Sequence, residues 1–242
     1  MRVTASNIKI NVECYPSSEK ASTFVFLLHG FTGSSKDWKE IIPHLKSNYS
    51  YVAIDLIGHG KSDSPQHVDH YKSHSFVAQL NEVFKHLTNN KFILIGYSMG
   101  GRAALSFAVQ HPDCLLGLLL ESASSGISDK KLREERVRSD AKIIKLIEEK
   151  SLKEFAEFWL NHDILASLKN LPHNKYKEIL KLKSKNSKIG LMNSLKGFGT
   201  GVMPPVNDKL NQLKCKNRIH PYFFIYRREF ILQKILSVLC SK

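Results

Sequence analysis

Residues 95–102 read "IGYSMGGR" and place Ser98 between Gly96 and Gly100, directly after an apolar run. A serine in a G-x-S-x-G pattern between a strand and a helix is typical of a nucleophile on a sharp turn, because larger side chains at the glycine positions would collide with the neighbouring strand or helix. The hydroxyl then projects at a helix start, where N–H groups and the helix dipole favour developing negative charge. We predict that Ser98 is catalytic; an ordinary turn serine is the alternative.

A glycine-rich segment, "HGFTGSSKDW" at 29–38, follows the apolar run "FVFLL". An oxyanion that develops at such a serine is stabilised by two backbone N–H groups. In this motif one N–H belongs to the residue after the nucleophile, here Met99, and the other to such a loop, here Phe31. We predict that these two residues form an oxyanion hole; a plain turn at a strand end is the alternative.

The segments around these loops alternate between two patterns. Two segments, 75–87 and 100–112, have the spacing of amphipathic helices. Short apolar runs predict strands buried on both faces at 24–30, 51–55, 91–96 and 115–122. The alternation predicts an α/β protein whose mainly parallel sheet is flanked by helices.

The pattern changes at about residue 129, where long charged and amphipathic segments begin and no strand-like run is found until about residue 200. This pattern predicts a helical cap over the sheet. We therefore expect a first part of the core at 1–128, the cap at 129–200, and an incomplete C-terminal part of the core at 201–242.

A third motif, "DLIGHGKSD" at 55–63, resembles the D-x-P-G-H-G-x-S turn of the α/β-hydrolase superfamily, with Ile57 in place of proline. We interpret this motif as a structural turn. Three motifs in the order of that superfamily predict the α/β-hydrolase fold, although the fold alone does not determine the reaction.

The cap narrows the resemblance to one family. Together with "GYSMGGR", four segments are similar to the 2-succinyl-6-hydroxy-2,4-cyclohexadiene-1-carboxylate synthases of the menaquinone and phylloquinone pathways: "ESASSGI", "REERVRSD" (133–140), "FWLNHDILASL" (158–168) and "LKLKSKNSKIGLMNSL" (180–195). The resemblance runs from about residue 24 to about residue 213, and its most specific parts are the arginine after the serine motif and the R-x-R-S-D run.

The resemblance implies a lyase without a cofactor. In that family the serine, made basic by a histidine, removes a proton from a cyclohexene that carries an enolpyruvyl group, and pyruvate is eliminated. Ser98 would be the proton-abstracting residue, with Tyr97 and Arg102 beside it. The substrate carries several carboxylates, which arginine binds with two charge-assisted hydrogen bonds.

The resemblance also places Arg136 and Trp159 of the cap over the substrate, and it puts Lys183 where the family has an arginine. A lysine keeps the charge but loses the two-pronged geometry. The alternatives are a solvated surface role for Arg102, a helix-face charge for Arg136, and core packing for Trp159.

The remaining members of a catalytic triad are not found. In this fold an acid and a histidine follow strands seven and eight. "YFFIY" at 222–226 is a candidate for strand seven, but only Asp208 and His220 remain nearby, and both precede it. Glu121, at the end of the run 115–122, is an alternative acid.

We hypothesise a reading-frame change near residue 215, since codons for "IYRRE" shifted by one base can encode the family's Tyr-Thr-Gly-Glu. The last strand and helix are then expected to be missing. With this ending we expect activity far below that of the family, because only oxyanion-hole and binding effects remain. An ester or acyl hydrolase and an inactive remnant of the same fold are the competing functions; the arginines favour the lyase, since ester pockets are mostly apolar.

The composition and the remaining motifs argue against several other classes of function. The formal charge of +14 suits anionic substrates, but no nucleic-acid-binding motif is found, so no nucleic-acid partner is expected. No run is long enough for a membrane span, and no secretory signal is seen. The three histidines in 66–74 lack a fixed geometry, so no metal site is predicted. A cytoplasmic location, with free thiols, is expected from four scattered cysteines: Cys14, Cys114, Cys215 and Cys240.

Overall fold

The computed structural model describes residues 1–18, 23–162, 168, 171–213 and 224–226. Seven strands form one sheet in the order β1-β2-β4-β3-β5-β6-β7. From β4 onward all pairs are parallel, while β2 runs antiparallel to β1 and β4. The strands are β1 (Arg2–Ala5), β2 (Ile8–Tyr15), β3 (Thr23–Leu28), β4 (Tyr49–Ile54), β5 (Phe92–Tyr97), β6 (Leu115–Glu121) and β7 (Phe224–Tyr226). The predicted mainly parallel sheet is confirmed.

Strand β3 shows why the short apolar runs are strands. Val25 and Leu27 pack with Trp38 on one face of the sheet. Phe26 and Leu28 belong to the larger cluster on the other face. Because successive side chains point to opposite faces, a strand covered on both faces is apolar throughout.

The N-terminal hairpin of β1 and β2 was not predicted. Its two-residue turn consists of Ser6 (φ +50°) and Asn7 (φ +63°), between the paired Ala5 and Ile8. Two positive φ angles are typical of the turn that matches the twist of a hairpin. The alternating pattern of "IKINV" was the available signal, because it alternates as a half-buried strand does.

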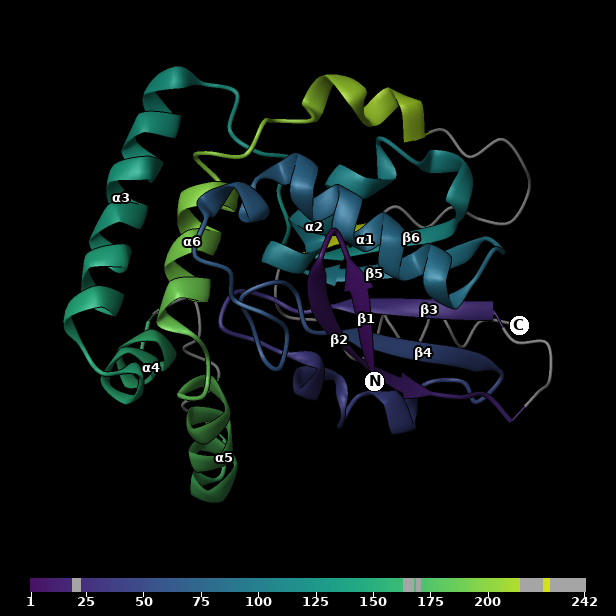
Figure 1. Cartoon of the computed structure of the whole chain (residues 1–242), viewed down its shortest axis with the longest axis horizontal. Coiled ribbons are helices and arrows are strands. Elements are labelled where there is room, and N and C mark those ends of the chain that lie inside the picture. The colour runs from purple at the N-terminus through teal and green to yellow at the C-terminus, as the bar shows by residue number, and fades with distance from the viewer. Residues whose placement is uncertain (19–22, 163–167, 169–170, 214–223, 227–242) are drawn as a thin grey trace.

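Helices α1 (Ser73–Leu87) and α2 (Met99–Ala108) correspond to the two predicted helical segments. Helix α2 is almost entirely buried, whereas α1 buries only one face, and Phe84 of α1 packs edge-on against Phe107 of α2 in the larger core cluster. Figure 1 shows them together against the sheet. Helix α2 therefore has a fixed position, and its first residue directly follows Ser98.

The charged region between 129 and 200 is helical, as predicted. Its helices are α3 (Lys130–Glu149), α4 (Leu152–Leu160), α5 (His173–Lys183) and α6 (Lys188–Phe198). They lie together at one side of the molecule, with α6 between α3 and the sheet (Figure 1). A small apolar cluster formed by Ile147, Phe155, Leu191 and Leu195 joins α3, α4 and α6. The division of the chain at 128/129 and 200/201 remains a prediction.

Strand β7 confirms the candidate for strand seven, since Phe224 pairs with Leu119 of β6 in a parallel register. His220 and the residues after Tyr226 lie outside the described residues, so the missing last strand and helix remain a prediction.

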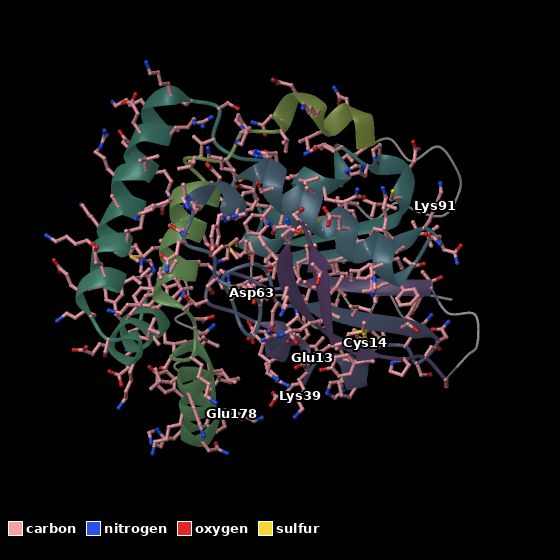
Figure 2. All side chains as sticks on the ribbon, viewed as in Figure 1. Glu13, Cys14, Lys39, Asp63, Lys91 and Glu178 are labelled. Atoms are coloured by element: carbon pink, nitrogen blue, oxygen red, sulfur yellow. The ribbon has the colours of Figure 1, made fainter. Side chains whose placement is uncertain are left out.

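Charged side chains project outward from helices α3 and α5, and Figure 2 labels Glu178 of α5. Within the described part of the chain, no helix has both the length and the apolar character needed to cross a bilayer.

Candidate active site

Ser98 lies on a strained turn between β5 and α2. Its φ of +50° and ψ of −110° are unusual for a residue with a side chain. The turn is held by the Ser98 N–H, which donates to the Glu121 carbonyl (2.8 Å), and by the Ser98 carbonyl, which accepts from the Arg102 N–H (3.0 Å). The predicted sharp turn at Ser98 is thus seen in the structure.

The two flanking glycines are required by close backbone contacts. A Cβ atom at Gly96 would lie 2.5 Å from the Gly100 carbonyl oxygen. A Cβ atom at Gly100 would lie 2.4 Å from the Leu28 carbonyl oxygen and 2.5 Å from that of His29. Strand β3, strand β5 and helix α2 therefore meet at a distance that permits only glycine at these two positions.

The glycine-rich loop after β3 lies directly beside Ser98. A Cβ atom at Gly30 would lie 3.4 Å from Ser98 Cβ and 2.7 Å from the ring of Tyr97. The loop is a turn closed by the Gly33 N–H, which donates to the Gly30 carbonyl (2.9 Å). Phe31 and Thr32 are its central residues, and Thr32 has φ +65°.

This arrangement leaves suitable donors near Ser98. The hydrogen bond that closes the turn does not use the Phe31 N–H, and Met99 is the first residue of α2, where N–H groups have no acceptor within the helix. The positions of Phe31 and Met99 are thus compatible with an oxyanion hole, and their role in it stays a prediction.

Trp159 of α4 contacts this loop from the cap. Its ring lies edge-on to Phe31, with centroids 5.2 Å apart, and stacks on Phe155 at 6.0 Å. Trp159 is partly buried against the small cap cluster. It therefore packs in the cap, as the alternative interpretation held, and also reaches the candidate oxyanion hole.

Lys183, at the end of α5, reaches the same loop. Its Nζ donates to Thr32 Oγ1 (3.2 Å) and lies 3.5 Å from the Thr32 carbonyl. The ammonium group is therefore one residue away from Phe31. A cation placed there can face a carboxylate of a ligand bound over Ser98.

Arg102 extends from α2 toward the cap on a different side. One Nη donates to the Phe198 carbonyl (3.3 Å), and the guanidinium lies 5.7 Å from the centroid of the Phe198 ring. Its Nε is buried and has no hydrogen-bond partner within the described part of the chain. Burial, with a further contribution from Arg136, lowers the pKa of Arg102 to about 10, so the side chain stays charged at neutral pH.

Arg136 and Asp140 form an ion pair on α3, between Nε and Oδ1 at 2.8 Å. The Arg136 side chain is 42% exposed, whereas that of Asp140 is 7% exposed. The other oxygen of Asp140 is buried without a hydrogen-bond partner among the described residues. Arg136 also lies near Arg102, since its charge contributes to the lowered pKa of that guanidinium. The i, i+4 spacing of Arg136 and Asp140 was the sequence signal that could have identified their pairing.

The predicted site residues therefore fall into two groups. Five residues are linked by contacts around the Ser98 turn and the loop at 30–33: Phe31, Tyr97, Met99, Trp159 and Lys183. Arg102 and Arg136 form the second group, between α2, α3 and α6. Both groups lie where the cap meets the core.

The "DLIGHGKSD" segment is a structural turn, as interpreted. Asp55 accepts hydrogen bonds from Asn11 Nδ2, the Ser35 N–H and the Lys61 N–H. Burial raises the pKa of Asp55, but the donated hydrogen bonds outweigh burial and the pKa is lowered overall. Asp55 therefore ties this turn to the loop after β3 and to β2.

Two buried histidines lie behind the loop. The Leu56 N–H donates to His29 Nε2 (3.0 Å), so His29 Nδ1 carries the proton and donates to the Gly30 carbonyl (2.7 Å). Burial, followed by the effect of His29, lowers the pKa of His59 to about 3. Both rings are neutral at pH 7 and support the loop. Their place in the site was not predicted.

Glu121 ends β6 and is paired in register with Tyr97. It is buried, and its Oε1 accepts a hydrogen bond from Ser122 Oγ (2.9 Å). A carboxylate at this strand end is therefore close to the Ser98 turn. Asp208 is exposed in a short 3-10 helix (Asn207–Leu213). Which of these acids serves a triad stays open, and His220 lies outside the described residues.

Comparison with known proteins agrees with this geometry. The model of the alpha/beta hydrolase fold family matches residues 23–181. A Bacillus subtilis (strain 168) protein with a provisional assignment as 2-succinyl-6-hydroxy-2,4-cyclohexadiene-1-carboxylate synthase is 36% identical over 80% of this chain and 70% of its own length. The synthase of that name from Enterobacter sp. (strain 638) is 29% identical over 84% and 73% of the two chains.

Among solved structures, MenH from S. aureus superimposes with a TM-score of 0.78 at 27% identity, covering 84% of this chain and 76% of that one. The family match spans the loop after β3, Ser98 and much of the cap. The chain therefore belongs to the α/β-hydrolase fold family and is a homologue of the 2-succinyl-6-hydroxy-2,4-cyclohexadiene-1-carboxylate synthases.

Proposed function

We propose that this chain is a lyase that eliminates pyruvate from 2-succinyl-5-enolpyruvyl-6-hydroxy-3-cyclohexene-1-carboxylate and forms 2-succinyl-6-hydroxy-2,4-cyclohexadiene-1-carboxylate. The observation that carries the proposal is a strained serine turn with a cation at the neighbouring loop, where Lys183 bonds Thr32, and a second cation on the helix that begins after the serine, where Arg102 bonds Phe198 of the cap. Its relatives of that name support the choice of substrate.

In the proposed reaction the residues act one after another. Once a base has taken its own proton, the Ser98 oxygen removes a proton from the ring, and negative charge develops on the substrate. The bond between the ring carbon and the enolpyruvyl oxygen breaks, a second ring double bond forms, and enolpyruvate leaves with the electron pair and is protonated to pyruvate. The N–H groups of Phe31 and Met99 then stabilise that charge, because fixed donors act without reorganisation. Ser98 itself needs a base, since a hydroxyl at its ordinary pKa is a weak one.

The cations account for substrate binding in this proposal. The substrate carries several carboxylates, and Arg102 offers a charged guanidinium whose Nε has no described partner. Arg136 and Lys183 add positive charge at the cap. The net charge of +14 draws anions toward the molecule. Trp159 closes the space above Phe31 with an apolar ring.

The test compares two substrates on the same preparation. The chain is incubated with the pathway adduct while pyruvate is followed by a coupled NADH assay, and separately with p-nitrophenyl acetate. We expect pyruvate release, at a rate below that of the relatives, and little ester hydrolysis. Ester hydrolysis without pyruvate release would replace the lyase with a small-molecule esterase, and turnover of neither substrate would indicate an inactive copy.

A further inference from the structure

We propose that Asn186, in the connection between α5 and α6, is a positioning residue that sets the loop of the candidate oxyanion hole from the cap. The inference deepens the proposed function, because it concerns the N–H donors that the reaction would use. It concerns a residue outside the catalytic groups named above. Its geometry is independent of which substrate binds.

Asn186 joins three segments through one buried side chain. It is 6% exposed. Its Nδ2 donates to the Thr32 carbonyl (2.9 Å) and to the Lys183 carbonyl (3.1 Å), and its Oδ1 accepts from the Gly60 N–H (3.2 Å). The amide group therefore links the cap to the loop after β3 and to the turn after β4 at the same time.

Thr32 is the residue that needs such an anchor. It has φ +65°, which a β-branched side chain adopts only under constraint from its surroundings. The hydrogen bond to its carbonyl fixes the peptide plane after Thr32, while the Gly33 to Gly30 bond closes the turn. Phe31 lies between these two restraints, so the direction of its N–H depends on both.

Lys183 contacts Thr32 as well, but it differs as an anchor. Its long side chain bonds the Thr32 hydroxyl through a single ammonium group, and a bound carboxylate would compete for that group. The Asn186 amide is short, buried and bonded on both of its polar atoms. The conformation of the loop at 30–33 therefore depends on how the α5–α6 connection packs against the core, and the buried Asn186 side chain is the fixed link between them.

A matched control is available in the same cap. Asn193 of α6 is 7% exposed, and its Nδ2 donates to the carbonyls of Pro65 (3.3 Å) and Gln66 (2.9 Å). It makes the same kind of bond from the cap to a core loop, but to a loop other than 30–33. Asn193→Ala should therefore lower stability to a similar extent without affecting the oxyanion hole.

The experiment uses Asn186→Ala, Asn186→Asp and Asn193→Ala in the full chain. Asn186→Asp keeps an acceptor for the Gly60 N–H but places a carboxylate oxygen against the carbonyls of Thr32 and Lys183, so it removes both bonds that Nδ2 donates and keeps the third. Hydrogen exchange is measured by mass spectrometry on peptides covering 30–34 and 64–68. In parallel, kcat and KM for pyruvate release are measured.

We expect both Asn186 variants to exchange faster at 30–34, and Asn193→Ala to exchange faster only at 64–68. In the Asn186 variants kcat should fall about 10-fold with KM changed less than about 2-fold, because a misplaced donor affects the transition state more than binding. Unchanged exchange at 30–34, or equal loosening by Asn193→Ala, would overturn the role of Asn186. A wild-type chain that releases no pyruvate contradicts the proposed function, whereas the exchange result still decides the positioning role.

Discussion

The Ser98 turn and the seam between core and cap are held together in different ways. At the turn, backbone meets backbone at the distances that only Gly96 and Gly100 permit. At the seam, single polar side chains such as Asn186 and Lys183 bridge segments more than 100 residues apart. The turn is therefore rigid by steric exclusion, and the seam is specified by a few hydrogen bonds.

The two regions should therefore respond differently to amino-acid substitutions. Excluded volume at close-packed backbone cannot relax, so the turn should fail abruptly when atoms are added. Each hydrogen bond of the seam contributes on the order of 1 kcal/mol, so the cap should loosen in steps. A fixed serine turn under an adjustable cap would suit the proposed lyase, whose substrate is a large anion.

The largest expected effect tests the rigid side of the comparison. Gly100→Ala places a methyl group against the Leu28 and His29 carbonyl oxygens, at 2.4 and 2.5 Å. We expect the free energy of unfolding to fall by about 3 kcal/mol, as measured by urea denaturation. The control is Gly117→Ala in β6, where the nearest atoms lie 3.8 and 3.9 Å from the added Cβ.

Equal stability of the Gly100→Ala and Gly117→Ala proteins would mean that the turn can relax. The contrast between a sterically fixed turn and an adjustable seam would then be lost. A small or stabilising effect at Gly117 is expected, because an alanine in a strand loses less conformational freedom on folding than a glycine.

The second prediction concerns His59, which lies under the loop beside Phe31. Its folded pKa is lowered to about 3 by burial, with a smaller effect of His29, and the unfolded pKa is near 6.5. Between pH 3 and pH 6.5 the unfolded chain binds more protons at His59 than the folded chain does, so the free energy of unfolding rises with pH over this range. The stability that the neutral ring contributes is therefore lost progressively as the pH falls below about 6.5. This one group should cost about 2 kcal/mol at pH 5 relative to pH 8.

Denaturation curves at several pH values test this contribution. His59→Gln should flatten the dependence on pH between 8 and 5, whatever its effect on stability at pH 8. A His59→Gln protein with the wild-type slope would show that the ring takes up its proton at the same pH in the folded and unfolded chains.

The smallest expected effect concerns the cation at the seam. Arg102→Met keeps an apolar stem against Phe198 but removes the charge. We expect KM for the pathway adduct to rise about 10-fold, since one charge-assisted hydrogen bond to the substrate is lost, and the free energy of unfolding to fall by about 1 kcal/mol, since the bond to the Phe198 carbonyl is lost as well. Arg138→Met, at an exposed position of α3, is the control. A KM equal to that of the wild type would show that Arg102 does not contribute to substrate binding.

The sequence predicted the turn better than the seam, for a physical reason. Glycine spacing around Ser98 and the apolar runs of β3 and β5 are local patterns, and each has a direct steric or burial cause. The bond from Asn186 to Thr32 joins residues 154 positions apart, and no local pattern encodes it. Asn186 lies within the quoted "LKLKSKNSKIGLMNSL" segment, yet an isolated asparagine there was indistinguishable from a surface residue.

The resemblance located cap residues that local patterns could not. It indicated Trp159 and Lys183, and both contact the loop at 30–33. It did not reveal that Arg136 is paired with Asp140, although their i, i+4 spacing on α3 was the available signal. The hairpin of β1 and β2 was not predicted, because β2 alternates apolar and polar residues and lacks the continuous apolar run of the central strands.

The central claim is that the hydroxyl held at the strained turn performs the chemistry on a substrate rich in carboxylates. The direct test is the rate of pyruvate release by the wild-type chain and by Ser98→Ala, at equal concentration and with equal thermal stability confirmed. We predict that the variant loses activity by about 10-fold or more, because the group that takes up the ring proton is removed; a loss of about 10³ is expected only for a serine that a triad base activates. Pyruvate release by Ser98→Ala within a few-fold of the wild-type rate would contradict the account.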